Sequence, residues 1–399
     1  MKLHYDEDTE RFRAEFLAWV TDNLPTPEER SEPRLSSAHI PEWGRAWQRK
    51  LFDAGWLVPG WPPELGGRNA TPIQQLVYFE EIARQHIPRA FNPQGLSIIT
   101  PSILDFGTPE QKERYALPTL RAETTFCLGM SEPGAGSDLA GLRTRAVLDG
   151  DHFVVNGQKV WTSGAQHADH CFCFVRTDVE APKHKGISVL IIDMSTPGIS
   201  VRPLPALTDP NIADFNEVFF TDVVVPRANL VGELNHGWSI AGGSLAHERG
   251  MLWIGQASRL EHDVERLRTI ATTPLAGGRR LADDALFRSN LARAYMEAQA
   301  LKFMGYRGFA KFAKGMESPE HSILKLYGSE LARRLDLEVT EALGALALDF
   351  DGAPQGLSQE AEEPWPMAYL HSFANTIAGG TSEVQHNIIA ERVLGLPRR

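Results

Sequence analysis

The first part of the chain carries its hydrophobic residues at helical spacing. Phe12 and Phe16 lie one turn apart, and the stretch IQQLVYFEEIARQ at 73–85 repeats an apolar stripe of the same kind. Hydrophobic positions that recur every three to four residues predict amphipathic helices. Between these stripes lie loops rich in turn residues, such as GWPPELGG and DFGTPEQ. We therefore expect an N-terminal helical domain over residues 1–120.

The period then changes from about 3.6 to two. Short alternating runs such as HCFCFVRT and NEVFFTDVVVP are typical of strands with one buried face. Two dipeptides, Asp149-Gly150 and Asn156-Gly157, are turn signals between such runs. This zone predicts a β domain over residues 121–235.

Helical periodicity returns after Gly237 in four long segments. We expect the remaining residues, 236–399, to form a helical bundle, which makes the whole chain an α+β protein. The expected helices cover these ranges: 237–270, 281–313, 320–348 and 367–393.

The end of the last segment reads NTIAGGTSEVQHNIIAERVLGLP. Ser382 and Gln385 predict a capping box, so that a helix begins after Gly379 and Gly380. Glycines at a helix N-terminus leave bare backbone N–H groups that can bind a ligand oxygen. They supply no reactive side chain, so any catalytic group of such a site must come from another segment.

Composition narrows the class of protein. The chain has 40 basic and 51 acidic side chains, a net charge of −11, which argues against general nucleic-acid binding. No apolar run approaches the roughly 20 residues of a membrane span, and the N-terminus lacks an apolar signal segment, which indicates a cytoplasmic protein.

The three cysteines, Cys127, Cys171 and Cys173, are too few for a disulfide framework. The last two share one face of a predicted strand, which favours core packing. Zinc-ligand spacing is missing, and His167 and His170 lack a third ligand, so no metal site is expected.

Two segments are candidates for ligand chemistry. GMSEPGAGSDLAG at 129–141 is neither a Walker loop nor a G-x-G-x-x-G fingerprint; it is either a tight connector or a loop whose N–H groups and hydroxyls surround a ligand. In NGQKVWTSGAQHAD, Trp161 is followed by two hydroxyl residues. An aromatic plate beside hydroxyls suits a flat heteroaromatic cofactor, although a lone tryptophan is usually a core residue.

Four motifs in this order, SEPGAGSDLAGLRT, NGQKVWTSGA, NLVGELNHGWSIA and AGGTSEVQHNIIAERVLG, resemble the acyl-CoA dehydrogenase family. The resemblance covers nearly the whole chain. It implies an N-terminal helical domain, a middle β-barrel or sandwich domain and a C-terminal four-helix bundle, with FAD between the last two. It also implies FAD-dependent α,β-dehydrogenation of an acyl-CoA thioester to a trans-2-enoyl-CoA.

The resemblance assigns roles to the motif residues. In the loop, Ser131 would bind the pyrimidine edge of the flavin and Ser137 would face the CoA. Trp161 would cover one face of the isoalloxazine, and Ser163 would donate to N5. The N–H of Gly379 would bind the thioester carbonyl. The full set of implied cofactor residues is Met130, Ser131, Ser137, Trp161, Thr162, Ser163, Thr381, Ser382 and Glu383.

The catalytic base is expected on a helix of the bundle. Many members of the family carry a glutamate where this chain has Gly379, and a second group carries it at the place where this chain reads SLAHERGML. Glu248 is therefore the candidate base, and burial beside ligand and flavin would raise its pKa. The alternative is a solvated helical glutamate. Arg249 matches a family arginine near the substrate, and His247 is interpreted as structural.

Two family segments that hold the diphosphate half of FAD are replaced here, by ATTPLAGGRR and EALGALALD. This departure resembles the catalytic chain of heterotetrameric members, including some of steroid side-chain degradation, in which a sister subunit supplies that half. Arg279 or Arg280 could compensate in a homotetramer or homodimer. The resemblance also implies an electron-transfer flavoprotein as acceptor. Two alternatives stay open: a non-catalytic partner subunit, and a flavin monooxygenase or nitroalkane-oxidase relative.

Overall fold

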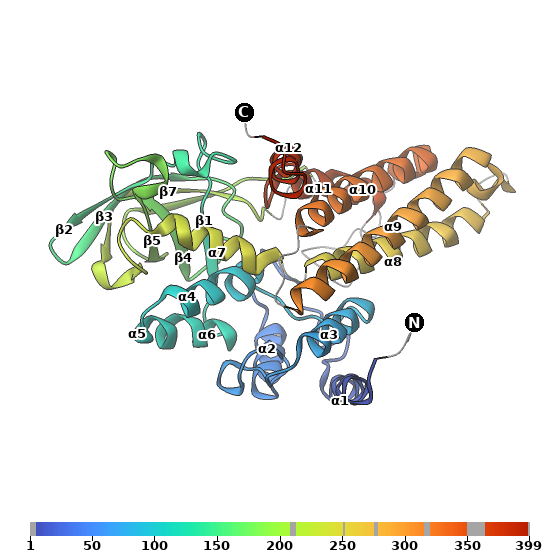
Figure 1. Ribbon diagram of the computed structural model, residues 1–399, viewed down its shortest axis with the longest axis horizontal. Helices are drawn as coiled ribbons and strands as arrows, with labels where there is room; N and C mark the ends of the chain where they lie inside the picture. Colours follow the sequence, from blue (N-terminus) through green and yellow to red (C-terminus); the bar gives the residue numbers. More distant parts are fainter. Residues whose placement is uncertain are drawn as a thin grey trace.

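The computed structural model describes residues 5–207, 213–249, 252–274, 278–314, 320–348 and 364–397. Within these ranges, the side chains of residues 244–249, 252, 312, 320, 321, 346 and 348 are not described. Figure 1 shows a β sheet at one end, a long helical bundle at the other and the N-terminal helices along one side of both. Among the described residues, no helix is long and apolar enough to cross a bilayer.

The N-terminal helices pack around an aromatic core. Phe16 contacts the ring of Trp56 at 4.9 Å between centroids, and Trp56 stacks parallel to Tyr78 at 6.5 Å. The expected stripe is therefore confirmed as the buried face of the first helix. The helices are α1 (Glu7–Asn23), α2 (Glu42–Asp53), α3 (Pro72–Arg84), α4 (Thr100–Phe106), α5 (Pro109–Gln111) and α6 (Leu117–Leu120).

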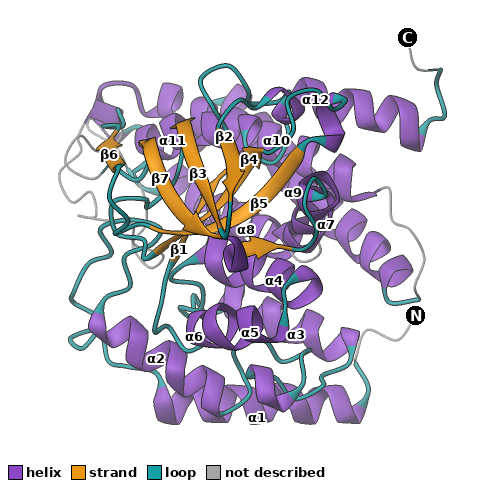
Figure 2. Cartoon of the chain, turned by 90° about the vertical axis from the view of Figure 1, so that its left-hand side faces the viewer, coloured by secondary structure: helices purple, strands orange, loops and turns teal. Residues whose placement is uncertain are grey.

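The middle of the chain forms one mixed sheet in the order β6-β7-β3-β2-β4-β5-β8, with β1 added in parallel to β4. Figure 2 shows the strands gathered above the N-terminal helices. The strands are β1 (Phe126–Gly129), β2 (Arg145–Asp149), β3 (His152–Lys159), β4 (His170–Arg176), β5 (Ile187–Asp193), β6 (Ile199–Pro203), β7 (Asn216–Pro226) and β8 (Leu230–Val231).

One of the two predicted turns is wrong. Asp149 and Gly150 do join β2 to β3, but Asn156 and Gly157 lie within β3, at a bulge where the register with β7 shifts. Gly157 has φ +153°, and a Cβ there would lie 2.6 Å from Cα of Thr144. Glycine is thus required by the close passage of two backbones and by the bulge, a use of glycine that sequence alone does not distinguish from a turn.

The different surroundings of Gly157 and Gly150 predict different losses of stability when each is replaced by alanine. Gly157→Ala should lower the free energy of unfolding by about 2–3 kcal/mol, because it combines a glycine-only φ with a steric clash. Gly150→Ala is the matched control: its φ is +59° but a Cβ meets no atom within 4 Å, so about 1 kcal/mol is expected. Denaturant unfolding of both variants checks this, and equal losses would contradict it.

The C-terminal helices differ from the sequence prediction near the end of the chain, where the expected helix over 367–393 is interrupted at residues 378–381. The expected helix over 237–270 corresponds to α7 and α8, and residues 250 and 251 between them lie outside the described residues. The helices are α7 (Gly237–Arg249), α8 (Leu252–Thr272), α9 (Ala285–Phe312), α10 (Glu320–Leu343), α11 (Trp365–Ile377) and α12 (Ser382–Ile388).

The predicted cap of the last helix is also displaced by one residue. Thr381 is the N-cap of α12, and its hydroxyl accepts from the N–H of Val384 at 3.2 Å. Ser382 instead donates to Glu330 on α10, and Gln385 Nε2 donates to the carbonyl oxygen of Gly379 at 3.0 Å. The capping box of Ser382 and Gln385 is therefore wrong, because the glutamine turns back to the glycine segment.

Helix α7 links the sheet to the bundle. It packs against β5 and against α4, where Gly243 lies close to the ring of Phe106. In Figure 1 it runs from the sheet toward the bundle, so its C-terminal end lies at the junction of the two.

Candidate functional site

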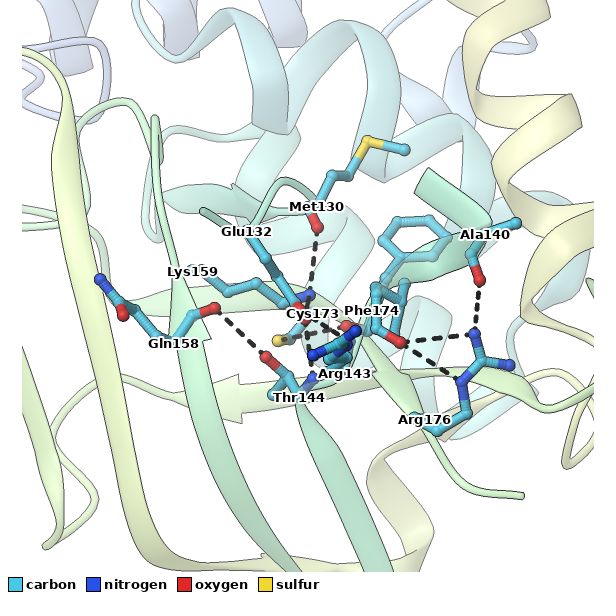
Figure 3. Close-up of polar contacts among 11 residues, drawn as sticks. Met130, Glu132, Ala140, Arg143, Thr144, Gln158, Lys159, Cys173, Phe174 and Arg176 are labelled. Carbon is cyan, nitrogen blue, oxygen red and sulfur yellow. Dashed lines mark hydrogen bonds and ion pairs between the residues drawn. The ribbon is translucent and has the colours of Figure 1, made fainter. Parts of the chain in front are cut away.

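A buried ion pair holds together the two ends of the glycine loop that follows β1. We call these two ends, residues 130–132 and 143–144, the neck of the loop. Lys159 at the end of β3 is fully buried, and its Nζ lies 2.9 Å from Oε1 of Glu132, which is 8% exposed. The same Nζ donates to the carbonyl oxygen of Met130 at 3.1 Å. Glu132 also accepts from the N–H groups of Arg143 and Thr144, at 2.6 and 2.8 Å, where the chain returns to the sheet (Figure 3).

This environment stabilises the charged form of Glu132. Burial by itself raises the pKa of its carboxyl group, but Lys159 and the hydrogen bonds from Thr144 outweigh burial and hold the pKa below its ordinary value. The carboxylate is therefore ionised at neutral pH, and it makes charge-assisted bonds to both sides of the loop.

Trp161 is a candidate cofactor residue with an unusual conformation. It has φ +59°, the residue is 61% exposed, and its indole makes an edge contact with Phe215, at 5.8 Å between centroids. A large exposed aromatic held in the left-handed region is a strained arrangement of the kind found at ligand sites. Val160 N donates to the carbonyl oxygen of Ser131 at 2.9 Å, so the glycine loop and the tryptophan segment lie side by side.

The polar groups near Trp161 fit a planar, hydrogen-bonding cofactor. Among the described residues, Thr162 Oγ1 is buried without a hydrogen-bond partner, and Ser131 and Ser163 are half-buried. Buried polar atoms are normally paired, so the Thr162 hydroxyl is a candidate contact for a bound group. These residues would hold the flavin ring of FAD, with Trp161 against its face. The bonds from Lys159 to Met130 and from Val160 to Ser131 place the segment of Met130 and Ser131 beside the segment of Trp161, Thr162 and Ser163.

Ser137 lies apart from this group on the outer part of the loop. It is exposed, and its neighbour Asp138 forms a surface ion pair with Lys183 at 2.7 Å. A small hollow of about 310 Å³ lies beside the neck of the loop, lined by Glu132, Pro133, Gly134, Gly141, Arg143, Thr144, Gly157 and Gln158.

The second glycine segment, Gly379 and Gly380, has backbone N–H groups that could bind a ligand oxygen. Gly379 and Gly380 have φ +66° and +97°; their carbonyl oxygens accept from Gln385 and from Lys325 Nζ, the latter at 2.5 Å. Their N–H groups make no hydrogen bond within the described residues. A Cβ on Gly379 would have 4.0 Å to its nearest atom, so the conformation and not the space requires glycine here.

The rest of this segment is anchored to the bundle. Thr381 caps α12, Ser382 bonds to α10 and Glu383 lies exposed in the first turn of α12. Figure 1 shows α12 between the sheet and the bundle, on the side of the molecule away from the N-terminal helices.

The side chains of the candidate base, Glu248, and of Arg249 lie outside the described part of the structure. Glu248 and Arg249 are the last two residues of α7, and the structure describes their backbone but not their side chains. Their position at the junction of sheet and bundle therefore comes from the helix alone. Arg279 and Arg280 lie in the connection from α8 to α9, which Figure 1 places at the end of the bundle away from the sheet.

A larger hollow of about 1250 Å³ lies elsewhere, between α3 and α8. It contains none of the predicted site residues, and its charged walls are paired with one another, as in the bond of Lys302 to Glu261 at 3.0 Å. The candidate site is therefore the adjoining glycine loop and Trp161 segment, and not this hollow.

The three cysteines, together with His167 and His170, have structural surroundings. All three thiols are buried and free, as predicted, and hydrogen bonds between thiols together with burial raise the pKa of Cys171 and Cys173. His167 Nδ1 bonds to Ser36 Oγ at 2.9 Å, and His170 packs against Tyr115 and Phe126, each at 5.2 Å between ring centroids.

His170 should make stability fall in weak acid. Burial lowers its pKa; Arg114 adds to this, and Asp193 and Asp169 oppose it. Because the unfolded chain then binds the proton more readily, the native state loses stability as pH falls below about 6.5. His170→Phe should make the Tm less dependent on pH between about 7.5 and 5.5, whereas the exposed His236→Gln should not. An unchanged slope in His170→Phe would contradict this.

Comparison with known proteins agrees with the fold and the motifs. Residues 6–123, 127–223 and 235–394 match, respectively, the N-terminal, middle and C-terminal domains of acyl-CoA dehydrogenase. The chain belongs to the acyl-CoA dehydrogenase family, a family of flavoprotein oxidoreductases.

Several relatives are similar over their full length. The acyl-CoA dehydrogenase IpdE1 of Mycobacterium tuberculosis is 38% identical, covering 98% of this chain and 99% of the relative. The ChsE4-ChsE5 complex of the same organism contains a chain with TM-score 0.82 and 35% identity, covering 100% of both chains. The Tcur3481-Tcur3483 steroid ACAD contains one with TM-score 0.80 and 31% identity, also covering 100% of both.

The ion pair of Glu132 and Lys159 was missed by sequence reasoning. The sequence does contain a signal for a buried Lys159, because this residue occupies an inward-facing position of β3 in the same alternation as Phe153 and Val155. A lysine at an inward position of a strand requires a buried partner. Its identity could not be read from the sequence, because Glu132 lies 27 residues away in a loop.

Proposed function

We propose that this chain is an FAD-dependent dehydrogenase that converts an acyl-CoA thioester to a trans-2-enoyl-CoA, with Glu248 as the base that removes the α-proton. The observation that carries the proposal is the exposed Trp161 in the left-handed region, beside the half-buried Ser131 and Ser163 and a Thr162 hydroxyl that is buried without a partner among the described residues. When bound, FAD supplies the acceptor at N5 for the hydride that leaves the β-carbon.

The chain's own residues would lower the barrier to proton removal in two ways. The α-proton is weakly acidic, so the developing negative charge on the thioester oxygen needs a fixed donor. The N–H of Gly379 is such a donor, because Lys325 and Gln385 hold the carbonyl groups of this segment and fix its orientation. Gly379 cannot be the base, and Glu248, at the end of α7, is the acidic residue that the family resemblance assigns.

A partner subunit would complete the cofactor site. Helix α9 is apolar on two opposite faces: Leu301 and Phe309 are buried in the bundle, while Met296 and Phe303 are 63% and 65% exposed. Met296 and Phe303 are seven residues apart and share one face, flanked by the exposed Ala292. Exposed apolar side chains grouped on one face of a helix mark a surface for a partner protein. We assign this face to a sister acyl-CoA dehydrogenase chain, which would also hold the diphosphate half of FAD; the similarity to a chain of the ChsE4-ChsE5 complex supports a partner of a different sequence.

The proposal also covers the class of acyl group in the substrate. The names of the relatives favour a bulky, ring-bearing acyl group, since one of the similar structures is a steroid ACAD. An electron-transfer flavoprotein is the expected acceptor of the electrons.

The test is anaerobic mixing of the FAD-loaded protein with straight, branched and steroidal acyl-CoAs. The expected result is bleaching of the flavin absorbance with loss of two hydrogens from the acyl group, detected by mass spectrometry. Bleaching by none of them, with FAD bound and the partner present, would contradict the proposal and favour a non-catalytic partner subunit. Oxygen-dependent hydroxylation of the substrate would indicate a monooxygenase.

A further inference from the structure

The buried ion pair connects the two segments that would contact the flavin. Lys159 precedes Trp161 by two residues in the chain, and Glu132 directly follows Ser131. Through its bonds to Met130 and Glu132, the Lys159 ammonium group holds the start of the glycine loop against the end of β3 (Figure 3).

We propose that Glu132 and Lys159 are positioning residues, which set the place of the Ser131 hydroxyl relative to the Trp161 ring and thereby the affinity and reduction potential of the flavin. This inference depends on the proposed binding of FAD, and it adds a role for two residues that would not touch the cofactor.

The shape of the loop supports this role. The two glycines near the tip of the loop have no packing: Gly134 and Gly136 are exposed, and a Cβ on either would meet no atom within 4 Å. Ala135 between them is buried in the core. Polar bonds hold the two ends of the loop, one through Glu132 and the other through Arg176 Nη2, which donates to the carbonyl oxygen of Ala140 at 2.6 Å.

Stability alone does not account for a charged pair at this place. Lys159 is fully buried near Cys171 and Cys173, in an otherwise apolar part of the sheet. Desolvation of two buried charges offsets much of their attraction, and apolar residues of similar volume often stabilise such a site equally well. What apolar residues would not provide is the set of directed bonds to Met130, Arg143 and Thr144.

The main test is the neutral double variant Glu132→Gln/Lys159→Met. It removes both charges together, so that no buried charge is left unpaired, and the glutamine can still accept from an N–H of the neck. We expect the apoprotein to unfold within a few degrees of wild type. FAD should bind about tenfold more weakly, equivalent to the loss of roughly one hydrogen bond to the flavin, and the flavin midpoint potential should shift.

A matched control is Asp138→Asn/Lys183→Met, which removes the exposed ion pair of the same loop, 2.7 Å long and more than 60% exposed on both sides. It should change neither FAD affinity nor potential, because exposed pairs contribute little. If the buried double variant does not fold, Lys159→Arg keeps the charge but alters the bond geometry, and it should fold, bind FAD and show a shifted potential.

Wild-type affinity and potential in the folded double variant, or in Lys159→Arg, would overturn the proposal and leave the pair a structural one. Failure of the proposed function gives a different result, because then wild type itself would not bind FAD or would not be reduced by any acyl-CoA.

Discussion

Replacing Glu248 by glutamine should slow flavin reduction by an acyl-CoA about 10²–10⁴-fold while leaving FAD bound. Glutamine has the shape of glutamate but cannot accept the α-proton, and general-base catalysis typically contributes a factor of this size. The measurement is the anaerobic bleaching rate of the flavin with the best substrate of the panel. The visible spectrum before mixing shows that the cofactor site is intact.

The matched control for this prediction is His247→Gln, one residue earlier on α7. It tests whether any change at this end of the helix disturbs the site, and also whether the histidine is the base. We expect bleaching close to the wild-type rate. A Glu248→Gln protein that bleaches as fast as wild type, or a His247→Gln protein that does not bleach, would show that the base has been assigned wrongly.

The fold could be predicted from the sequence wherever one physical signal dominates. The apolar stripe of α1 has one explanation, burial of one face, and the structure confirms it. The segment HCFCFVRT does form a strand, β4, but its two faces are buried in two different core clusters, which the period of two did not indicate. Glycine has several uses, so the prediction failed there. Asn156-Gly157 looks like a hairpin turn, but its glycine serves a bulge, and only the position of Thr144 across the sheet reveals this.

The candidate site shows the same limit. Motif residues such as Ser131 and Trp161 could be predicted because they lie in long, recognisable segments. The ion pair behind them could not, because nothing in the sequence brings residue 132 next to residue 159. The cap of α12 was misplaced for a related reason: Ser382 and Gln385 both found partners outside the helix, Glu330 on α10 and the Gly379 carbonyl, which a local pattern does not include.

Introducing charge on the exposed face of α9 should separate the chain from its partner. Met296→Glu/Phe303→Glu removes two apolar side chains from the proposed interface, each contributing about 1.5–3 kcal/mol when buried, and would bury two carboxylates in their place. Since 1.4 kcal/mol is a factor of ten, association should weaken about a hundredfold or more. Light scattering should then give a mass near the 44.3 kDa of one chain instead of a larger complex.

Loss of assembly should also loosen FAD, because the partner is proposed to hold its diphosphate half. Ile73→Glu on α3 is the control, since Ile73 is exposed to 41% but is not part of an apolar helix face of this kind; it should leave both mass and FAD content unchanged. A double variant that keeps the wild-type mass would show that the α9 face is not the interface. A monomer that retains FAD as tightly as the complex would show instead that this chain holds the whole cofactor itself. Arg279 and Arg280 could not explain that result within one chain, because the connection that contains them lies at the end of the bundle away from the sheet.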